Sequence, residues 1–137
     1  MKNLDKLKEL FESLLVGQEI EKADGSTLTL KNGTTLRIIE DFDCCCSADG
    51  GFKVTSEDFQ AAITSVEVTG SHNDFDDTSE LKVTILHNGE GIVDMQGSAE
   101  GYIYYFTALS MNVVDVNGED IGSYYLIDSE GRVLEGS

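Results

Sequence analysis

The chain has 137 residues, of which 40 % are apolar and none is proline. This length predicts one domain, residues 1–137, which can bury enough apolar surface to fold without disulfide bonds. No apolar run approaches the ~18 residues that span a membrane, and the N-terminus lacks the apolar core of a secretory signal. We therefore expect a cytoplasmic protein with reduced thiols.

The formal net charge is −17, and it is distributed unevenly along the chain. Residues 1–53 carry ten acidic and seven basic residues, whereas residues 54–137 carry sixteen acidic and only two basic ones. Such a surface repels nucleic acid and anionic membranes, because both are bound through basic side chains. It can attract a basic protein partner, or it can serve solubility alone.

Residues 4–15 are predicted to form an amphipathic helix. Apolar residues recur at spacings of three and four positions, and lysines and glutamates fill the opposite face. Asn3 is the candidate N-cap, and Gly17 is the candidate end of the helix. The apolar positions are Leu4, Leu7, Leu10, Phe11, Leu14 and Leu15.

After the helix the apolar period drops from about 3.6 towards about 2, which is typical of β-strands. Asp24-Gly25 and Asn32-Gly33 are turn signals on either side of the alternating run Thr27–Leu30. A third run covers Thr34–Phe42, so these segments predict an antiparallel meander. Further strand candidates are 63–69, 81–88, 91–96, 102–116, 124–128 and 132–134. The predicted fold class is α+β, with the helix followed by a mainly antiparallel β-sheet or a partly open barrel.

All three cysteines lie in the segment 41–47, where the third predicted strand enters a glycine-containing loop. Adjacent cysteines pair only with strain, and an odd total leaves a free thiol, so a disulfide framework is excluded. On an extended segment Cys44 and Cys46 point to the same face, and both sulfurs can reach one tetrahedral zinc ion. The candidate metal site therefore consists of Asp43, Cys44, Cys45 and Cys46.

The ligand set and the role of this cysteine segment both have alternatives. Asp41 can replace Asp43 as the oxygen ligand, and His72 or His87 can supply a nitrogen. Structural zinc sites usually space their cysteines by about two to four residues and use a second pair, which this chain lacks. Without a metal, the cysteines can pack as small buried apolar residues. A reactive thiol is the third possibility, but no histidine lies close in sequence to act as its base.

The segment 71–80 concentrates acidic residues between two predicted strands. It resembles a calcium loop only faintly, because the glycine at the turn and the spacing to the last glutamate are missing. We expect a solvated, mobile loop. If it has a role, the expected one is contact with a basic partner through Asp74, Asp76, Asp77 and Glu80.

Sequence signals of catalysis are missing. The chain has no nucleophile-elbow serine, no glycine-rich phosphate loop and no paired histidines at helical spacing. Its five tyrosines lack the neighbouring basic residues that a base-stacking surface needs. The sequence therefore predicts a protein that is not an enzyme and that does not bind nucleic acid directly.

Three segments, Leu15–Ile20, Thr27–Leu36 and Asp43–Cys46, resemble a small bacteriophage-encoded family of unknown function. That family carries an Asp-Cys-Cys motif after an N-terminal hairpin and ends in a Tyr-Tyr segment, which 123–125 can match. The extra Cys46 and the preceding helix depart from its pattern. The resemblance implies a phage or prophage origin and names no chemistry.

As a class, small acidic phage proteins without catalytic motifs are similar to anti-CRISPR proteins that act on type II effector nucleases. Those effectors hold guide and target in positively charged channels, which an acidic surface can occupy or block. The resemblance thus implies a non-catalytic inhibitor that binds a basic surface of a host defence complex, with a structural zinc. The alternatives are a virion or assembly protein, whose leucine face at residues 4–15 packs on a partner subunit, and a small zinc-dependent enzyme.

Overall fold

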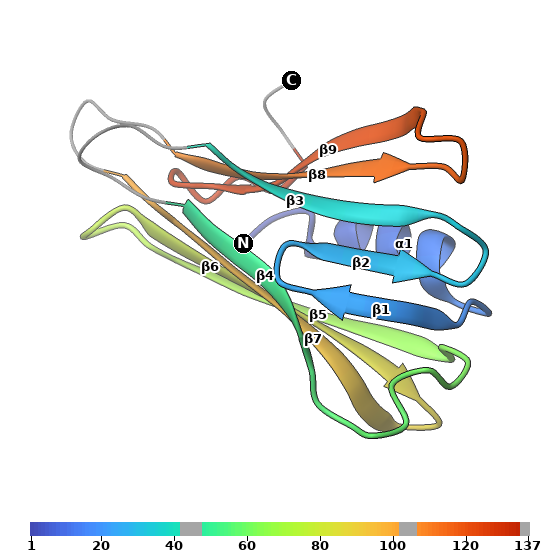
Figure 1. Ribbon diagram of the computed structural model, residues 1–137. Helices are drawn as coiled ribbons and strands as arrows, with labels where there is room; N and C mark the ends of the chain where they lie inside the picture. The colour runs from blue at the N-terminus through green and yellow to red at the C-terminus, as the bar shows by residue number, and fades with distance from the viewer. Residues whose placement is uncertain (42–47, 102–106, 135–137) are drawn as a thin grey trace.

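The computed structural model describes residues 1–41, 48–101 and 107–134, which form one helix and nine strands (Figure 1). The helix is α1 (Leu4–Leu15), as the apolar spacing predicted. The strands are β1 (Ile20–Asp24), β2 (Thr27–Leu30), β3 (Thr35–Asp41), β4 (Ala48–Val54), β5 (Ser65–Asn73), β6 (Thr78–His87), β7 (Glu90–Glu100), β8 (Ala108–Val114) and β9 (Asp120–Asp128).

The strands form two sheets, in the orders β1-β2-β3-β8-β9 and β4-β7-β6-β5. All strand pairs are antiparallel. The chain leaves the first sheet after β3, builds the whole second sheet, and returns with β8 beside β3 (Figure 1). The predicted α+β class is therefore confirmed, but the described strands divide between two sheets instead of forming one.

Helix α1 packs against β5 and closes one side of the core. Leu7, Phe11 and Leu15 are fully buried, and the other leucines of the same face pack on the core cluster. This burial explains why residues 4–15 are helical, because an amphipathic segment of this length is stabilised mainly by the packing of its apolar face against the rest of the protein. The leucine face is thus largely covered within the chain.

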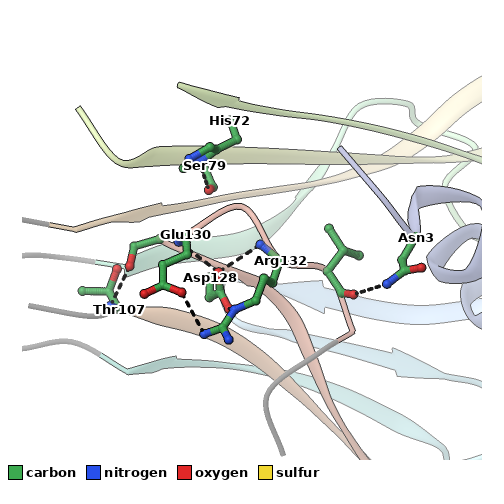
Figure 2. Close-up of polar contacts among 9 residues, drawn as sticks. Asn3, His72, Ser79, Thr107, Asp128, Glu130 and Arg132 are labelled. Atoms are coloured by element: carbon green, nitrogen blue, oxygen red, sulfur yellow. Dashed lines mark hydrogen bonds and ion pairs between the residues drawn. The ribbon is translucent and has the colours of Figure 1, made fainter. Parts of the chain in front are cut away.

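The structure confirms the predicted end of α1 at Gly17 but not the predicted capping role of the Asn3 side chain. Gly17 has φ of 86°, the left-handed conformation expected at the end of a helix. Asn3 holds the N-cap position, but its side chain makes no capping hydrogen bond. Its Nδ2 donates instead to the carbonyl of Val133 at 3.1 Å, which ties the start of the helix to the end of the described chain (Figure 2).

The glycine-containing loop expected after the cysteine segment, at residues 48–51, is wrong, because these residues belong to β4. Gly50 of β4 is paired with Gly97 of β7, and the side chain of Leu109 lies over both. A Cβ atom at Gly97 would lie 2.3 Å from Leu109 Cδ2, and one at Gly50 would lie 2.8 Å from Leu109 Cδ1. The glycines that indicated a loop are instead required for the two sheets to approach each other.

A second close approach joins the sheets at the turn between β1 and β2. The N–H of Phe52 donates to the carbonyl of Gly25 at 2.7 Å, which forms an isolated antiparallel bridge. A Cβ atom at Gly51 would lie 3.0 Å from the same carbonyl oxygen. Buried apolar side chains from α1 and both sheets form one core cluster.

Several strand limits also differ from the sequence prediction. β9 begins at Asp120 rather than at residue 124, and residues 132–134 form no strand. β8 begins at Ala108, and residues 102–106 of the predicted run lie outside the described residues. No helix in the described part of the chain has the length and apolar character needed to cross a membrane.

Candidate interaction surface

The outer face of the second sheet carries ordered rows of polar side chains. Asp49, Ser98, Glu80 and Ser71 are successive register partners across β4, β7, β6 and β5. The two carboxylates and Ser71 are exposed, whereas the neighbouring residues along each strand turn towards the core. Side chains alternate between the two faces of a strand, so this row faces away from the core.

This outer face is hollowed, and the depression has a volume of about 860 Å³. Its charges are separated along the strands. Lys53 and Lys82 lie at one end around Asp94, whose Oδ2 is 3.8 Å from Lys82 Nζ. Asp49 and Glu80 lie towards the other end, the one that leads to the turn between β5 and β6.

That turn holds three of the four predicted partner-binding residues. β5 continues to Asn73 and β6 begins at Thr78, so Asp74, Asp76 and Asp77 lie in the four-residue turn, and all three are exposed. Glu80 lies two residues into β6 and faces the hollow. We call residues 74–80 the acidic hairpin end; it lies at the left in Figure 1.

The solvated loop that the sequence predicted at residues 71–80 is shortened to a hydrogen-bonded turn of four residues, because β5 and β6 extend into it. Asn73 Oδ1 accepts from the N–H of Phe75 at 2.9 Å, an interaction that closes an Asx turn. The carbonyl of Asp77 accepts from the N–H of Gly101 at 2.9 Å, which links the turn to the end of β7. Regular pairing continues up to Asn73 and Thr78, the last register pair of β5 and β6.

A half-buried histidine supports the base of the turn (Figure 2). His72 Nδ1 lies 2.8 Å from Ser79 Oγ, and His72 Nε2 lies 3.1 Å from Asp74 Oδ1. The other side of the ring packs on Gly131, where a Cβ atom would lie 2.7 Å from His72 Cγ. His72 thus lies between Asp74 and Ser79, with a hydrogen bond to Ser79, but Ser79 is fully buried and no substrate can reach its hydroxyl.

The turn that contains Gly131 is fixed by a buried carboxylate (Figure 2). Asp128 is 1 % exposed, and its Oδ1 accepts from the N–H groups of Glu130 and Arg132 at 2.9 and 3.0 Å. Asp128 Oδ2 accepts from Arg132 Nε at 2.8 Å, and Arg132 Nη2 lies 3.3 Å from Glu130 Oε2. This cluster was not predicted. The sequence signal for it is an aspartate three residues before a turn glycine, which is typical of side-chain-closed turns.

The outer face of the first sheet differs from that of the second. Its register rows place Thr27, Arg37, Asn112 and Ser123 across the strands, with a hydrogen bond of 3.0 Å from Ser123 Oγ to Asn112 Oδ1. Arg37 is the charged residue among these four, and it is basic. This row of the first sheet thus carries no acidic residue, whereas the row across the second sheet carries Asp49 and Glu80.

The predicted metal ligands Asp43, Cys44, Cys45 and Cys46 lie outside the described residues. Within the ranges that are described, no group of three or more histidine, cysteine, aspartate or glutamate residues is placed to hold a metal ion. The two histidines have other partners, since His72 contacts Ser79 and Asp74 and His87 Nδ1 donates to the carbonyl of Ala62 at 2.6 Å. The zinc site stays a prediction.

Comparison with known proteins gives one match. No curated protein and no solved structure matches the chain significantly. One family model, described as a domain of unknown function (DUF7448), matches residues 13–111, a stretch from the end of α1 into β8. It includes the acidic hairpin end and the four strands of the second sheet, and it covers more than half of the chain. The protein therefore belongs to the DUF7448 family.

Proposed function

We propose that this protein is a non-catalytic inhibitor that binds a basic surface of a host nucleic-acid-handling protein. The observation that carries the proposal is the acidic hairpin end, where Asp74, Asp76, Asp77 and Glu80 are exposed within seven residues. Within the described residues, no ion pair with a lysine or arginine is formed by any of the four. Carboxylates held together without a lysine or arginine partner attract a basic surface over a distance of about one Debye length, roughly 8 Å at physiological salt.

The contacts that hold the hairpin in place favour a role in binding over a role in solubility alone. Charges that only keep a protein soluble need no fixed positions, whereas this turn is tied to Gly101 and rests through His72 on the turn at Gly131. A surface that is already ordered loses less conformational freedom when a partner binds. The neighbouring row with Asp49 and Glu80 extends the same acidic surface across the second sheet.

Among basic partners, we favour a type II CRISPR effector nuclease in the host cytoplasm. Its channels for guide and target carry positive charge, and they bind through shape and backbone contacts that an acidic protein can block. The net charge of −17 opposes direct binding of the protein to the nucleic acid itself. In this proposal a zinc ion at Asp43 and Cys44–Cys46, in the segment of the sequence between β3 and β4, has a structural role.

A triple variant, Asp74→Asn, Asp76→Asn and Asp77→Asn, is expected to weaken binding to a purified type II effector–guide RNA complex about 10-fold at 0.1 M salt. Each exposed ion pair contributes about 0.2–1 kcal/mol, so three together account for roughly a factor of ten. Asparagine keeps the size of the side chain and tolerates the positive φ of 50° at Asp77. Biolayer interferometry with the immobilised effector measures the dissociation constant.

The matched control removes three exposed carboxylates elsewhere, with Glu21→Gln on β1 and Glu119→Gln and Asp120→Asn at the start of β9. Both variants change the net charge by the same amount, so a general charge effect weakens both equally. The proposal requires a clearly larger loss for the hairpin variant. Equal losses, or no binding by the unmodified protein, would contradict it.

A further inference from the structure

Phe75 lies at the tip of the acidic hairpin end and is 98 % exposed. The next most exposed large apolar residues among those described are Val116 at 70 % and Ile121 at 57 %. A phenylalanine ring that stays in water contributes nothing to the core and leaves a large apolar surface solvated. Packing within the chain therefore does not account for an aromatic residue at this position.

Hydrogen bonds order the backbone of the turn that carries Phe75. The N–H of Phe75 is bound by Asn73 Oδ1, and Thr78 Oγ1 donates to the carbonyl of Asp76 at 3.4 Å. Asp77 adopts a left-handed conformation with φ of 50°, which reverses the chain into β6. The ring is thus presented from a fixed turn at the end of two long paired strands.

The chemistry around the ring restricts what can receive it. Asp74, Asp76 and Asp77 flank Phe75 in the sequence and are exposed, and their charges repel the phosphates of nucleic acids and of anionic lipids. A protein pocket with an apolar floor and a rim of arginine or lysine side chains complements both the ring and the carboxylates. Large aromatic residues that fill such pockets contribute most of the binding energy in many interfaces, and surrounding polar contacts exclude water from them.

We infer that Phe75 is the anchor of the interface, and that it inserts into an apolar pocket rimmed by basic residues on the partner protein. This inference rests on the proposed function, since it names the kind of pocket that the acidic hairpin end would meet. It adds a contact that charge does not supply, so its contribution to affinity persists at high salt. The aspartates orient the approach, and the ring determines how long the complex lasts.

The test compares Phe75→Ala and Phe75→Trp with the matched control Ile121→Ala, which removes an exposed apolar side chain from β9. The probe is the purified type II effector–guide RNA complex, and affinity is measured at about 0.1 and about 0.5 M salt. We expect Phe75→Ala to weaken binding about 30-fold, mainly through faster dissociation, and Phe75→Trp to remain within about 3-fold of the unmodified protein. Melting temperatures should be the same for all four proteins.

The outcomes separate the anchor from the proposed function. If Phe75→Ala binds as well as the unmodified protein, or no worse than Ile121→Ala, the anchor is refuted and the charge-based function stands. If the unmodified protein does not bind the effector, the proposed function fails and the anchor fails with it. A fall in melting temperature for Phe75→Ala would show that the ring packs within the chain, which also refutes the anchor.

Discussion

Replacing Phe11 with alanine is expected to lower the free energy of unfolding by about 3–5 kcal/mol. Phe11 is fully buried in the middle of α1, between Leu7 and Leu15, and its loss leaves a cavity that the two sheets cannot fill by small shifts. The free energy of unfolding of a domain of this size is only about 5–15 kcal/mol, so the variant loses a large part of its stability. Urea unfolding followed by circular dichroism measures the change.

Lys8→Ala is the matched control for this variant, because Lys8 lies in the same helix and is exposed. It should change the free energy of unfolding by less than about 0.5 kcal/mol, since alanine and lysine have similar helix propensities. If Phe11→Ala costs no more than Lys8→Ala, α1 does not close the core in the way that the structure shows.

Replacing Asp128 with alanine is expected to lower the free energy of unfolding by about 2–3 kcal/mol. The substitution leaves the N–H groups of Glu130 and Arg132 without their acceptor in a turn whose aspartate is almost fully buried. The exposed part of Arg132 can return to water, which limits the cost of losing the ion pair. Thermal unfolding followed by fluorescence or calorimetry reports the difference.

Asp128→Asn separates the two contributions of this carboxylate. Asparagine keeps an oxygen acceptor for the two backbone N–H groups and removes the charge that faces Arg132 Nε. It should therefore cost clearly less than the alanine variant. Equal losses for the two variants would mean that the ion pair with Arg132, and not the backbone hydrogen bonds, holds the turn.

The parts of the fold that were predicted correctly depend on local signals. The apolar spacing of residues 4–15 predicted α1 with the limits that the structure shows, and Gly25 and Gly33 mark the first two turns with positive φ. β4 was missed because its two adjacent glycines are typical of loops. What makes them a strand is Leu109, which comes from the other sheet and lies far away in sequence.

The residues of the candidate site were predicted from the sequence, but the strands that hold them were not. The sequence singled out Asp74, Asp76, Asp77 and Glu80, and the structure places all four at one exposed end of the second sheet. The sequence did not reveal that the pairing of β5 with β6 extends to Asn73 and Thr78, because the polar residues there do not alternate with apolar ones.

The supporting residues behind the site depend on tertiary contacts. The contact of His72 with Gly131 follows from the way the hairpin meets the turn after β9. No local pattern carries that information, since the two segments are separated by most of the second half of the chain. The zinc site in the cysteine segment stays a prediction.

The most direct test of the acidic interface is the salt dependence of binding between the unmodified protein and a purified type II effector–guide RNA complex. Because exposed charges are screened as the Debye length shortens, the affinity should fall at least about 10-fold between about 0.05 and about 0.3 M sodium chloride. The acidic hairpin variant should show a shallower dependence. An affinity that does not change with salt, or no binding at the lowest salt concentration, would contradict an acidic surface that docks on a basic partner.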